Sequence, residues 1–220
     1  MKLTAFNGSP RGKGSNTKIL LDQFIDGFMR NSDNSHEIAY LNKVKDAETF
    51  SAMFKEAEQV LLAFPLYHDS MPAIVKSFIE MLKPFGGRQR NPGIGFIVQS
   101  GFPESIHSKY VERYLEKLSK RLRCQYLGTI IKGGVERIKA RPPWMTRKLF
   151  KSFYQLGKTF GETAEFDSRI ITKLAKPERF SKIFLLLFKI LDKTGLTEFY
   201  WNDQLKKNNA YEKRFDRPYK

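Results

Sequence analysis

The sequence predicts an α/β protein built on a parallel sheet with helices on both faces. Five strand-like apolar segments alternate with segments of helical periodicity. Two of them, 59–64 and 93–98, are continuous apolar runs of the kind that parallel sheets bury on both faces. Right-handed crossovers between such strands place the connecting helices on both sides of the sheet. With 220 residues and 41% hydrophobic content, the chain can bury a sizeable core.

The elements can be assigned in order along the chain. A buried strand leads into the glycine-rich segment 8–17, and Ser15 is available to cap an amphipathic helix over 16–30. Pro72 suits the first turn of a later helix, which continues to residue 82. The other predicted elements are strands over 37–42, 59–64, 93–98 and 126–131, and helices over 49–58, 106–123 and 144–163.

The segment 8–17 has the composition of a phosphate-binding loop. Its glycines allow close backbone approach, the following helix offers free N–H groups, and Arg11 with the hydroxyls of Ser9, Ser15 and Thr17 could complete the shell. The spacing fits neither a Walker A loop nor the dinucleotide fingerprint, whose third glycine would stand where Thr17 does. We therefore expect a site for a single terminal phosphate. The alternative is a Gly/Pro turn that binds nothing.

Two further unusual loops also follow strand ends. Residues 65–71 come directly after the third strand and residues 99–104 after the fourth. Ligands of open parallel sheets bind at the carboxyl ends of the strands, near the switch in strand order. We expect these two loops and the segment 8–17 to converge on one site.

The composition of the chain excludes some kinds of cofactor and favours one compartment. With the solitary Cys124, the chain can form neither an intrachain disulfide nor a cysteine-ligated iron–sulfur cluster, and we expect no metal. The sequence shows neither a secretory signal nor a run of about 18 apolar residues, so we expect a cytoplasmic protein. Cys124 is interpreted as a small buried residue, and His36 and His107 as structural or solvated residues.

The positive charge lies in the second half of the chain. Residues 1–110 hold 13 Lys and Arg against 11 Asp and Glu, a net of +2, whereas residues 111–220 hold 26 against 12, a net of +14. Such an excess can attract nucleic acid, an anionic membrane or an anionic cofactor, or can be a solvated surface without a partner. Because no nucleic-acid-binding motif accompanies the charge, a nucleic-acid partner is not expected.

Three ordered motifs resemble the flavodoxin-like NAD(P)H-dependent FMN reductase family, in its branch related to iron–sulfur flavoproteins. They are Gly8-Ser-Pro-Arg11 with Ser15-Asn-Thr17, Pro65-Leu-Tyr67 with Met71-Pro72, and Ser100-Gly-Phe-Pro-Glu104. The resemblance implies a three-layer sandwich with strand order 2-1-3-4-5, FMN as cofactor, NADPH or NADH as co-substrate, and a homodimer. Residues implied to bind the cofactor are Ser9, Arg11, Ser15, Asn16, Thr17, Pro65, Leu66, Tyr67, His68, Met71, Ser100, Gly101 and Phe102.

The chain departs from that branch in two ways. The relatives carry cluster cysteines after the second strand, whereas residues 42–49 contain none, so a flavin-only protein is expected. The family fold ends near residue 165, which leaves residues 166–220 as a basic helical extension on the domain, on a partner subunit or on a membrane. Its apolar segment 180–191 is too short to span a bilayer but could lie on an anionic surface, at the inner face of the membrane.

The resulting functional hypothesis is an FMN-dependent oxidoreductase. Electrons would pass from NAD(P)H through the flavin to a small acceptor such as a flavin or a quinone. Hydride transfer to a flavin needs stacked rings more than a protein acid or base, so no catalytic residue is assigned, although His68 could donate a proton to an acceptor. The alternative is a flavoprotein electron carrier or redox sensor without steady turnover.

Overall fold

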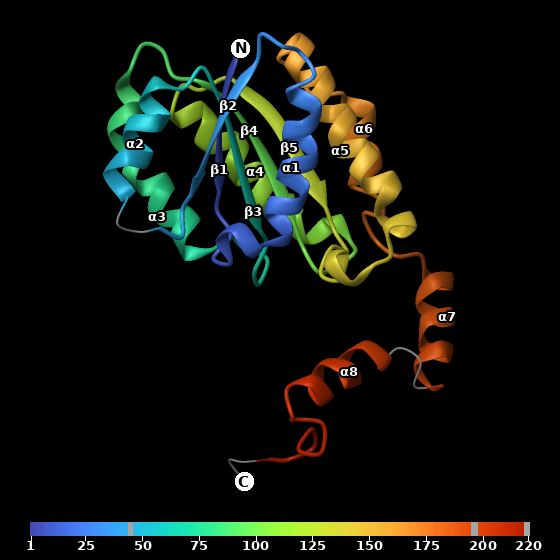
Figure 1. Ribbon diagram of the computed structural model, residues 1–220. Coiled ribbons are helices and arrows are strands. Elements are labelled where there is room, and N and C mark those ends of the chain that lie inside the picture. Colours follow the sequence, from blue (N-terminus) through green and yellow to red (C-terminus); the bar gives the residue numbers. More distant parts are fainter. Residues whose placement is uncertain (44–45, 195–197, 218–220) are drawn as a thin grey trace. The chain divides into compact units, whose positions relative to one another are not determined.

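The computed structural model describes residues 1–43, 46–194 and 198–217. The chain divides into two compact units, Met1–Arg179 and Phe180–Lys220. Each unit is described by itself below. Figure 1 shows the first unit as a sheet with helices on both of its faces.

The sheet has five parallel strands in the order β2-β1-β3-β4-β5. This confirms both the parallel sheet predicted from the strand pattern and the strand order implied by the resemblance. Strand β1 pairs with β2 on one side and with β3 on the other, so the strand order reverses between β1 and β3. The strands are β1 (Lys2–Asn7), β2 (Ser35–Tyr40), β3 (Gln59–Pro65), β4 (Gly93–Gln99) and β5 (Tyr126–Lys132).

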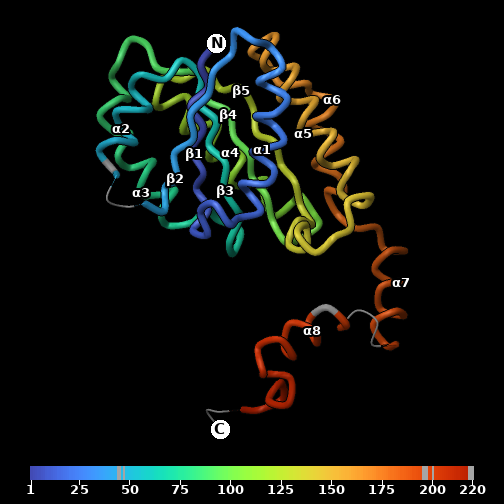
Figure 2. Tube along the Cα trace, viewed as in Figure 1, coloured from blue at the N-terminus to red at the C-terminus, as the bar shows by residue number. Residues whose placement is uncertain are grey.

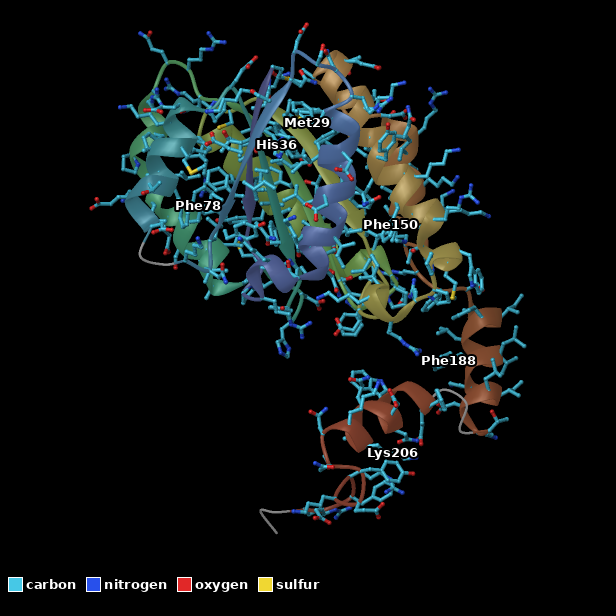
Figure 3. The ribbon with its side chains drawn as sticks, viewed as in Figure 1. Met29, His36, Phe78, Phe150, Phe188 and Lys206 are labelled. Carbon is cyan, nitrogen blue, oxygen red and sulfur yellow. The ribbon has the colours of Figure 1, made fainter. Side chains whose placement is uncertain are left out.

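Six helices of the first unit enclose two hydrophobic cores, one on each face of the sheet. On one face, Phe54 and Phe78 pack in a core with the apolar face of α4, and Figure 3 shows Phe78 pointing from α3 toward the sheet. On the other face, Phe24, Phe153 and Leu174 belong to the second core. The helices are α1 (Asn16–Phe28), α2 (Ala47–Glu56), α3 (Ala73–Met81), α4 (Lys109–Arg121), α5 (Pro143–Thr163) and α6 (Ser168–Leu174).

Helices α1 and α5 approach each other very closely through glycines. A Cβ atom on Gly157 would lie 1.8 Å from the carbonyl oxygen of Phe24, and one on Gly27 would lie 1.9 Å from that of Tyr154. No side chain can be placed at such distances, so glycine is required for the two backbones to pack directly. This contact fixes the second half of α5 beside the second half of α1.

The largest difference from the predicted elements lies before α4, which begins at Lys109 rather than at residue 106. Residues Ser105–Ser108 form a 3₁₀ turn (η4) instead. The backbone N–H groups of Ser105 and Ile106 donate to the carbonyl oxygens of Pro177 and Glu178, so these groups serve a tertiary contact and not the first turn of a longer helix. Similar short turns are η1 (Gly12–Gly14), η3 (Lys83–Gly87) and η5 (Ile138–Ala140).

The second unit contains α7 (Lys182–Asp192) and α8 (Phe199–Lys207), which Figure 2 traces at the end of the chain. The large apolar side chains of α7 are exposed and belong to neither core. The predicted domain boundary at residue 165 stays a prediction. In the structure α6, which follows that boundary, contacts β5 and α5 and belongs to the first compact unit. Within the predicted extension 166–220, residues 195–197 and 218–220 lie outside the described residues.

Candidate functional site

Loops from four strands gather at the carboxyl edge of the sheet, at the lower end of the first unit in Figure 1. The first loop (8–15) follows β1, the second (66–72) follows β3 and the third (100–104) follows β4. These are the three loops that the sequence singled out. A fourth loop (133–142) follows β5, and sequence reasoning did not include it in the site, although Gly133-Gly134 marked the end of that strand.

The first loop is shaped by internal hydrogen bonds. Gly12 has a φ of +52°, which favours glycine, and its carbonyl oxygen accepts from the Ser15 hydroxyl at 2.7 Å. The same hydroxyl accepts the N–H of Lys18 at 3.1 Å and so caps α1, as the sequence predicted. Asn7, at the end of β1, donates from Nδ2 to Ser15 Oγ at 3.3 Å. The hydroxyl of Ser15 therefore holds the loop in shape.

Other predicted residues of this loop divide between support and binding. Ser9 is buried, and its Oγ accepts the N–H of Arg11 at 3.3 Å. Thr17 Oγ1 accepts from Nε2 of Gln99 at 3.2 Å, which joins the start of α1 to the end of β4. The Arg11 side chain is exposed. Asn16 and Thr17 occupy the first turn of α1, where backbone N–H groups lack an intrahelical acceptor and carry the positive end of the helix dipole.

The second loop is a tight hairpin with an unusual backbone. Tyr67 and Ser70 exchange backbone hydrogen bonds of 2.8 and 3.0 Å around His68 and Asp69. These two central residues have φ values of 48° and 59°, the left-handed conformation that a type I′ turn requires and that Asn-Gly usually supplies. Two such residues in sequence store strain, which proteins retain mainly at functional positions.

The third loop presents an aromatic ring at the site. Ser100 Oγ donates to the carbonyl oxygen of Phe102 at 2.8 Å, and this turn leaves the Phe102 ring 56% exposed. The ring of His107 stacks on it, with a centroid separation of 4.8 Å and an interplanar angle of 28°. Nδ1 of His107 lies 3.0 Å from Oδ1 of Asp69 in the hairpin. The second and third loops are thus joined through His107.

These two loops enclose a cavity of about 540 Å³, which we call the loop cavity. Four residues predicted from the sequence line it, together with two that were missed. Pro65 is not among the lining residues; it pairs in register with Gln99 at the end of β3. Met71 packs against the hydrophobic core. The lining residues are Leu66, Tyr67, His68, Asp69, Phe102 and His107.

His107, interpreted from the sequence as a structural or solvated residue, also has a place at the candidate site. It lines the loop cavity and contacts both neighbouring loops. The only signal in the sequence was its place five residues after Phe102. The 3₁₀ turn η4 brings it back over that loop, and periodicity alone does not predict such a turn.

The fourth loop braces the third loop and the start of α1. The N–H groups of Gly134 and Val135 donate to the carbonyl oxygens of Phe102 and Ser100, at 2.9 and 3.0 Å. Nδ2 of Asn16 donates to the carbonyl oxygen of Val135 at 3.0 Å, which ties the start of α1 to this loop. Asn16 and Ser100 therefore have supporting contacts, and Gly101 lies in the same turn, where a Cβ would come within 3.5 Å of Glu136.

Positive charge surrounds the first loop. Nζ of Lys139, in the fourth loop, donates to the carbonyl oxygen of Gly14. At the end of β5, burial lowers the pKa of Lys132, and the neighbouring positive charge of Arg141 lowers it further. Within the described ranges, no three His, Cys, Asp or Glu side chains gather in a metal-binding arrangement. The site therefore combines a loop rich in hydrogen-bond donors with an aromatic cavity.

Comparison with solved structures establishes the fold. The chain is similar to an azoreductase from Bacillus anthracis, at 14% identity and a TM-score of 0.58, over 73% of this chain and all of the other. An FMN-dependent NADH-azoreductase from Bacillus anthracis in complex with FMN matches at 11% identity and TM-score 0.55, over 74% of this chain and 99% of that one. An NAD(P)H:quinone oxidoreductase from Methanothermobacter marburgensis matches at 12% identity and a TM-score of 0.58, over 75% of this chain and 99% of that one.

The sequence itself matches a protein family over its first part. No curated protein is a significant match to the chain. Residues 1–102 match the family described as NADPH-dependent FMN reductase. The matched segment contains the first and second loops and ends at Phe102 of the third loop, so it includes all thirteen residues assigned to the cofactor site from the sequence. Residues 1–102, slightly less than half of the chain, are thus similar to the NADPH-dependent FMN reductase family.

Proposed function

We propose that the chain binds FMN at the carboxyl edge of its sheet and reduces a small acceptor, such as a flavin or a quinone, with electrons from NADH or NADPH. The family that residues 1–102 match supports the class of this activity, an FMN-dependent oxidoreductase that uses a nicotinamide nucleotide. One observation carries the proposal for these residues. A donor-rich loop and an aromatic cavity lie side by side at the point where the strand order reverses.

The first loop fits the phosphate of FMN. The N–H groups of Asn16 and Thr17 point from the positive end of α1, and the exposed Arg11 adds a charged donor. The Ser15 hydroxyl donates to the carbonyl oxygen of Gly12 and so shapes the loop, whereas Ser9 and Thr17 accept hydrogen bonds within the fold and keep their O–H groups for a phosphate. A phosphate dianion needs several donors and positive charge, and this set offers both.

The second and third loops fit a flat ring with one apolar face. Leu66, Tyr67 and Phe102 give the loop cavity apolar and aromatic walls, and its volume of about 540 Å³ lies within the usual range for ligand sites. The backbone of the Tyr67–Ser70 hairpin provides polar groups beside these walls. FMN bound here supplies the redox chemistry, as acceptor of a hydride and donor of electrons.

Protein side chains of the loop cavity orient the reactants and exclude water. The Phe102–His107 stack and the contact of His107 with Asp69 hold the second and third loops together. His107 and His68 can each donate a hydrogen bond to an oxygen or nitrogen atom of an acceptor that lies in the cavity. No further protein acid or base is needed, because stacking and distance control hydride transfer.

The first experiment is a visible spectrum of the purified protein with FMN, followed by anaerobic addition of NADH or NADPH. Bound flavin that bleaches with the nucleotide supports the reductase, whereas bound flavin that does not bleach favours a carrier or sensor. Absence of flavin binding would contradict the proposal. Arg11→Ala should weaken FMN binding about tenfold or more, since charge-assisted hydrogen bonds contribute about 1.5–3 kcal/mol. Arg30→Ala, at the exposed end of α1, is the matched control.

We also propose that the second unit associates with the surface of an anionic membrane. Side chains on every side of α7, from Ile183 to Leu191, are between 44% and 73% exposed, and Figure 3 shows Phe188 projecting away from this helix. A helix that is apolar all round is stable only when it is surrounded by apolar material. Lys182, Lys189 and Lys193 supply charge for anionic lipids.

Two measurements distinguish membrane association from the alternative, which is a homodimer that forms through α7. The part of the chain that the structure describes contains no helix with the length and apolarity needed to cross a bilayer, so the association would be peripheral. We expect the protein to co-sediment with vesicles that contain anionic lipid and to leave them at high salt. Failure to co-sediment, with a dimer mass in light scattering that is lost in Phe188→Asp, would assign α7 to a subunit interface instead.

A further inference from the structure

A second cavity, of about 710 Å³, lies beside the first loop. We call it the α5 cavity, because the beginning of α5 forms one wall and α1 and the fourth loop form the others. Its apolar wall consists of Ile19, Ile138, Pro143 and Phe150, and Figure 3 labels Phe150 on this side of the first unit. Lys139, which lines the cavity, donates to the carbonyl oxygen of Gly14 in the first loop. The α5 cavity is therefore a direct neighbour of the proposed phosphate site.

All charged side chains that line the α5 cavity are positive. Lys139, Arg141 and Arg147 line it, and none of the residues that line it is acidic. Arg141 is held in place by its hydrogen bond to the carbonyl oxygen of Gly134, at 2.9 Å. Three cations around one apolar cavity repel one another, and an anionic ligand with more than one charged group would relieve that repulsion.

An exposed indole completes the cavity. Trp144 lines it and is 74% exposed, at the start of α5, where Pro142 and Pro143 restrict the backbone before the helix. A large aromatic ring in this position, with Arg141 and Arg147 in the same lining, is a stacking surface for a planar base whose phosphates meet the cations. An aliphatic acid could pack against the apolar wall, but it would contact neither the flat face of the indole nor all three cations.

We propose that the α5 cavity binds the adenosine-phosphate half of NADPH, with the adenine against Trp144 and the 2′-phosphate near Arg147. This inference rests on the proposed function and makes it more specific, because it names the 2′-phosphorylated nucleotide as the preferred electron donor. The two cavities have no lining residue in common, and the α5 cavity is joined to the proposed FMN phosphate site through the hydrogen bond from Lys139 to Gly14. The volume of the cavity is sufficient for a nucleotide.

The first test needs neither flavin nor turnover. The chain has two tryptophans, Trp144 and Trp201, so the titration is made in a Trp201→Phe background, in which the tryptophan fluorescence comes from Trp144 alone. Titration with 2′,5′-ADP should quench it, with an affinity about tenfold higher than that of 5′-ADP, because one further phosphate meets a cation. The quenching should disappear in Trp144→Phe. Inorganic phosphate that competes as well as 2′,5′-ADP, or the absence of any quenching, would overturn the proposal.

The second test uses the enzyme loaded with FMN. Arg147→Ala should raise the KM for NADPH about tenfold and the KM for NADH less than about twofold, with kcat unchanged, because a cation that meets the 2′-phosphate has no partner in NADH. Lys151→Ala is the matched control. Lys151 lies one turn farther along α5, is exposed, and does not line the cavity, so it removes the same charge without the contact.

Different results would contradict the nucleotide site and the proposed reductase reaction. If NADPH bleaches the bound flavin but Arg147→Ala and Lys151→Ala have the same KM for NADPH, the α5 cavity is not the nucleotide site and the reductase proposal stands. If the protein binds no FMN while 2′,5′-ADP still quenches Trp144, the cavity binds the nucleotide but the proposed reaction is wrong. An equal increase in the KM for both nucleotides in Arg147→Ala would contradict recognition of the 2′-phosphate.

Discussion

At the scale of single residues, His107 shapes the loop cavity, which would receive the acceptor. Its ring stacks on Phe102 and its Nδ1 contacts Asp69, so its removal opens the cavity without touching the first loop. We expect His107→Ala to slow reoxidation of the flavin by a quinone about tenfold and to leave the Kd of FMN within about twofold, because one charged or polar contact to the acceptor is lost. Stopped-flow measurement of the two half-reactions checks this.

The matched control for His107 is His36, which lies on β2 and does not line the loop cavity. His36→Ala should leave both half-reactions unchanged. Should His107→Ala slow reduction by NAD(P)H and reoxidation equally, the residue would support the whole site and would have no specific role toward the acceptor.

Cys124 is an unreactive thiol for a physical reason. It is buried, and desolvation raises its pKa from an ordinary 9.0 to about 11. At pH 8 its thiolate fraction is therefore about 100-fold lower than that of an ordinary thiol, and its access is restricted as well. Iodoacetamide should label the native protein at pH 8 much more slowly than the protein unfolded in guanidinium. Equal labelling rates in the two states would show that this region opens readily.

The same raised pKa predicts how stability depends on pH. The native thiol keeps its proton at a pH where the unfolded thiol has lost it. The contribution of Cys124 to the free energy of unfolding is thus fully present below about 9.0, the unfolded value, and is lost as the pH rises through about 11. The denaturation midpoint of Cys124→Ala should consequently fall less between pH 8 and pH 10.5 than that of the unchanged protein.

At the scale of elements, the α1–α5 contact is the most constrained feature of the first unit. Gly157→Ala would place a methyl group 1.8 Å from the carbonyl oxygen of Phe24, which forces the helices apart. We expect a loss of about 3 kcal/mol or more in the free energy of unfolding, at the upper end of overpacking effects. Urea denaturation followed by circular dichroism measures it.

Gly87→Ala is the control for this prediction. Gly87 ends the 3₁₀ turn η3, and a Cβ atom there would meet nothing within 4 Å. Its replacement should change stability by less than about 0.5 kcal/mol, as is usual for surface positions. If Gly157→Ala were equally mild, the two helices would have to be able to separate without cost.

Regular elements of the first unit could be predicted because their signals are local. Alternation of apolar runs with helical periodicity located the five strands and α1 to α5, and the ends of β1, β3 and β4 located three site loops. The contacts that complete the site are not local. His107 meets Asp69 across 38 positions, and Lys139 reaches Gly14 across 125. Such pairs depend on tertiary packing, which periodicity and composition do not encode.

The roles of the predicted hydroxyls in the first loop and at the start of α1 stay predictions. Ser9 and Thr17 accept hydrogen bonds within the fold and keep their own O–H groups to donate to a phosphate, whereas the Ser15 hydroxyl donates to the carbonyl oxygen of Gly12. Small hydroxyl residues both bind anions and cap or brace turns, and the sequence does not separate the two uses. The residue types at the first loop were therefore predictable, whereas the division between support and binding was not.

On the scale of the whole molecule, the first unit has two hydrophobic cores, and the described residues of the second unit belong to neither of them. Both hydrophobic cores consist of residues no later than Leu174. Residues 180–220 hold 9 Lys and Arg against 5 Asp and Glu, a net of +4, next to the exposed apolar side chains of α7. Exposed apolar surface with positive charge is the combination that binds anionic bilayers. Catalysis and localisation are thus expected to reside in separate parts of the chain.

A chain shortened to residues 1–179 tests that separation. Since both cores and all four site loops lie before Arg179, the fragment should unfold cooperatively and bind FMN with a Kd within about twofold of the full chain, because distant, independent regions contribute additively. It should no longer co-sediment with anionic vesicles, because α7 is absent. The full chain with Phe188→Asp is the companion variant, expected to keep FMN and to lose most of the vesicle binding. A fragment that aggregates or binds no flavin would show that the second unit covers the first and is required for its function.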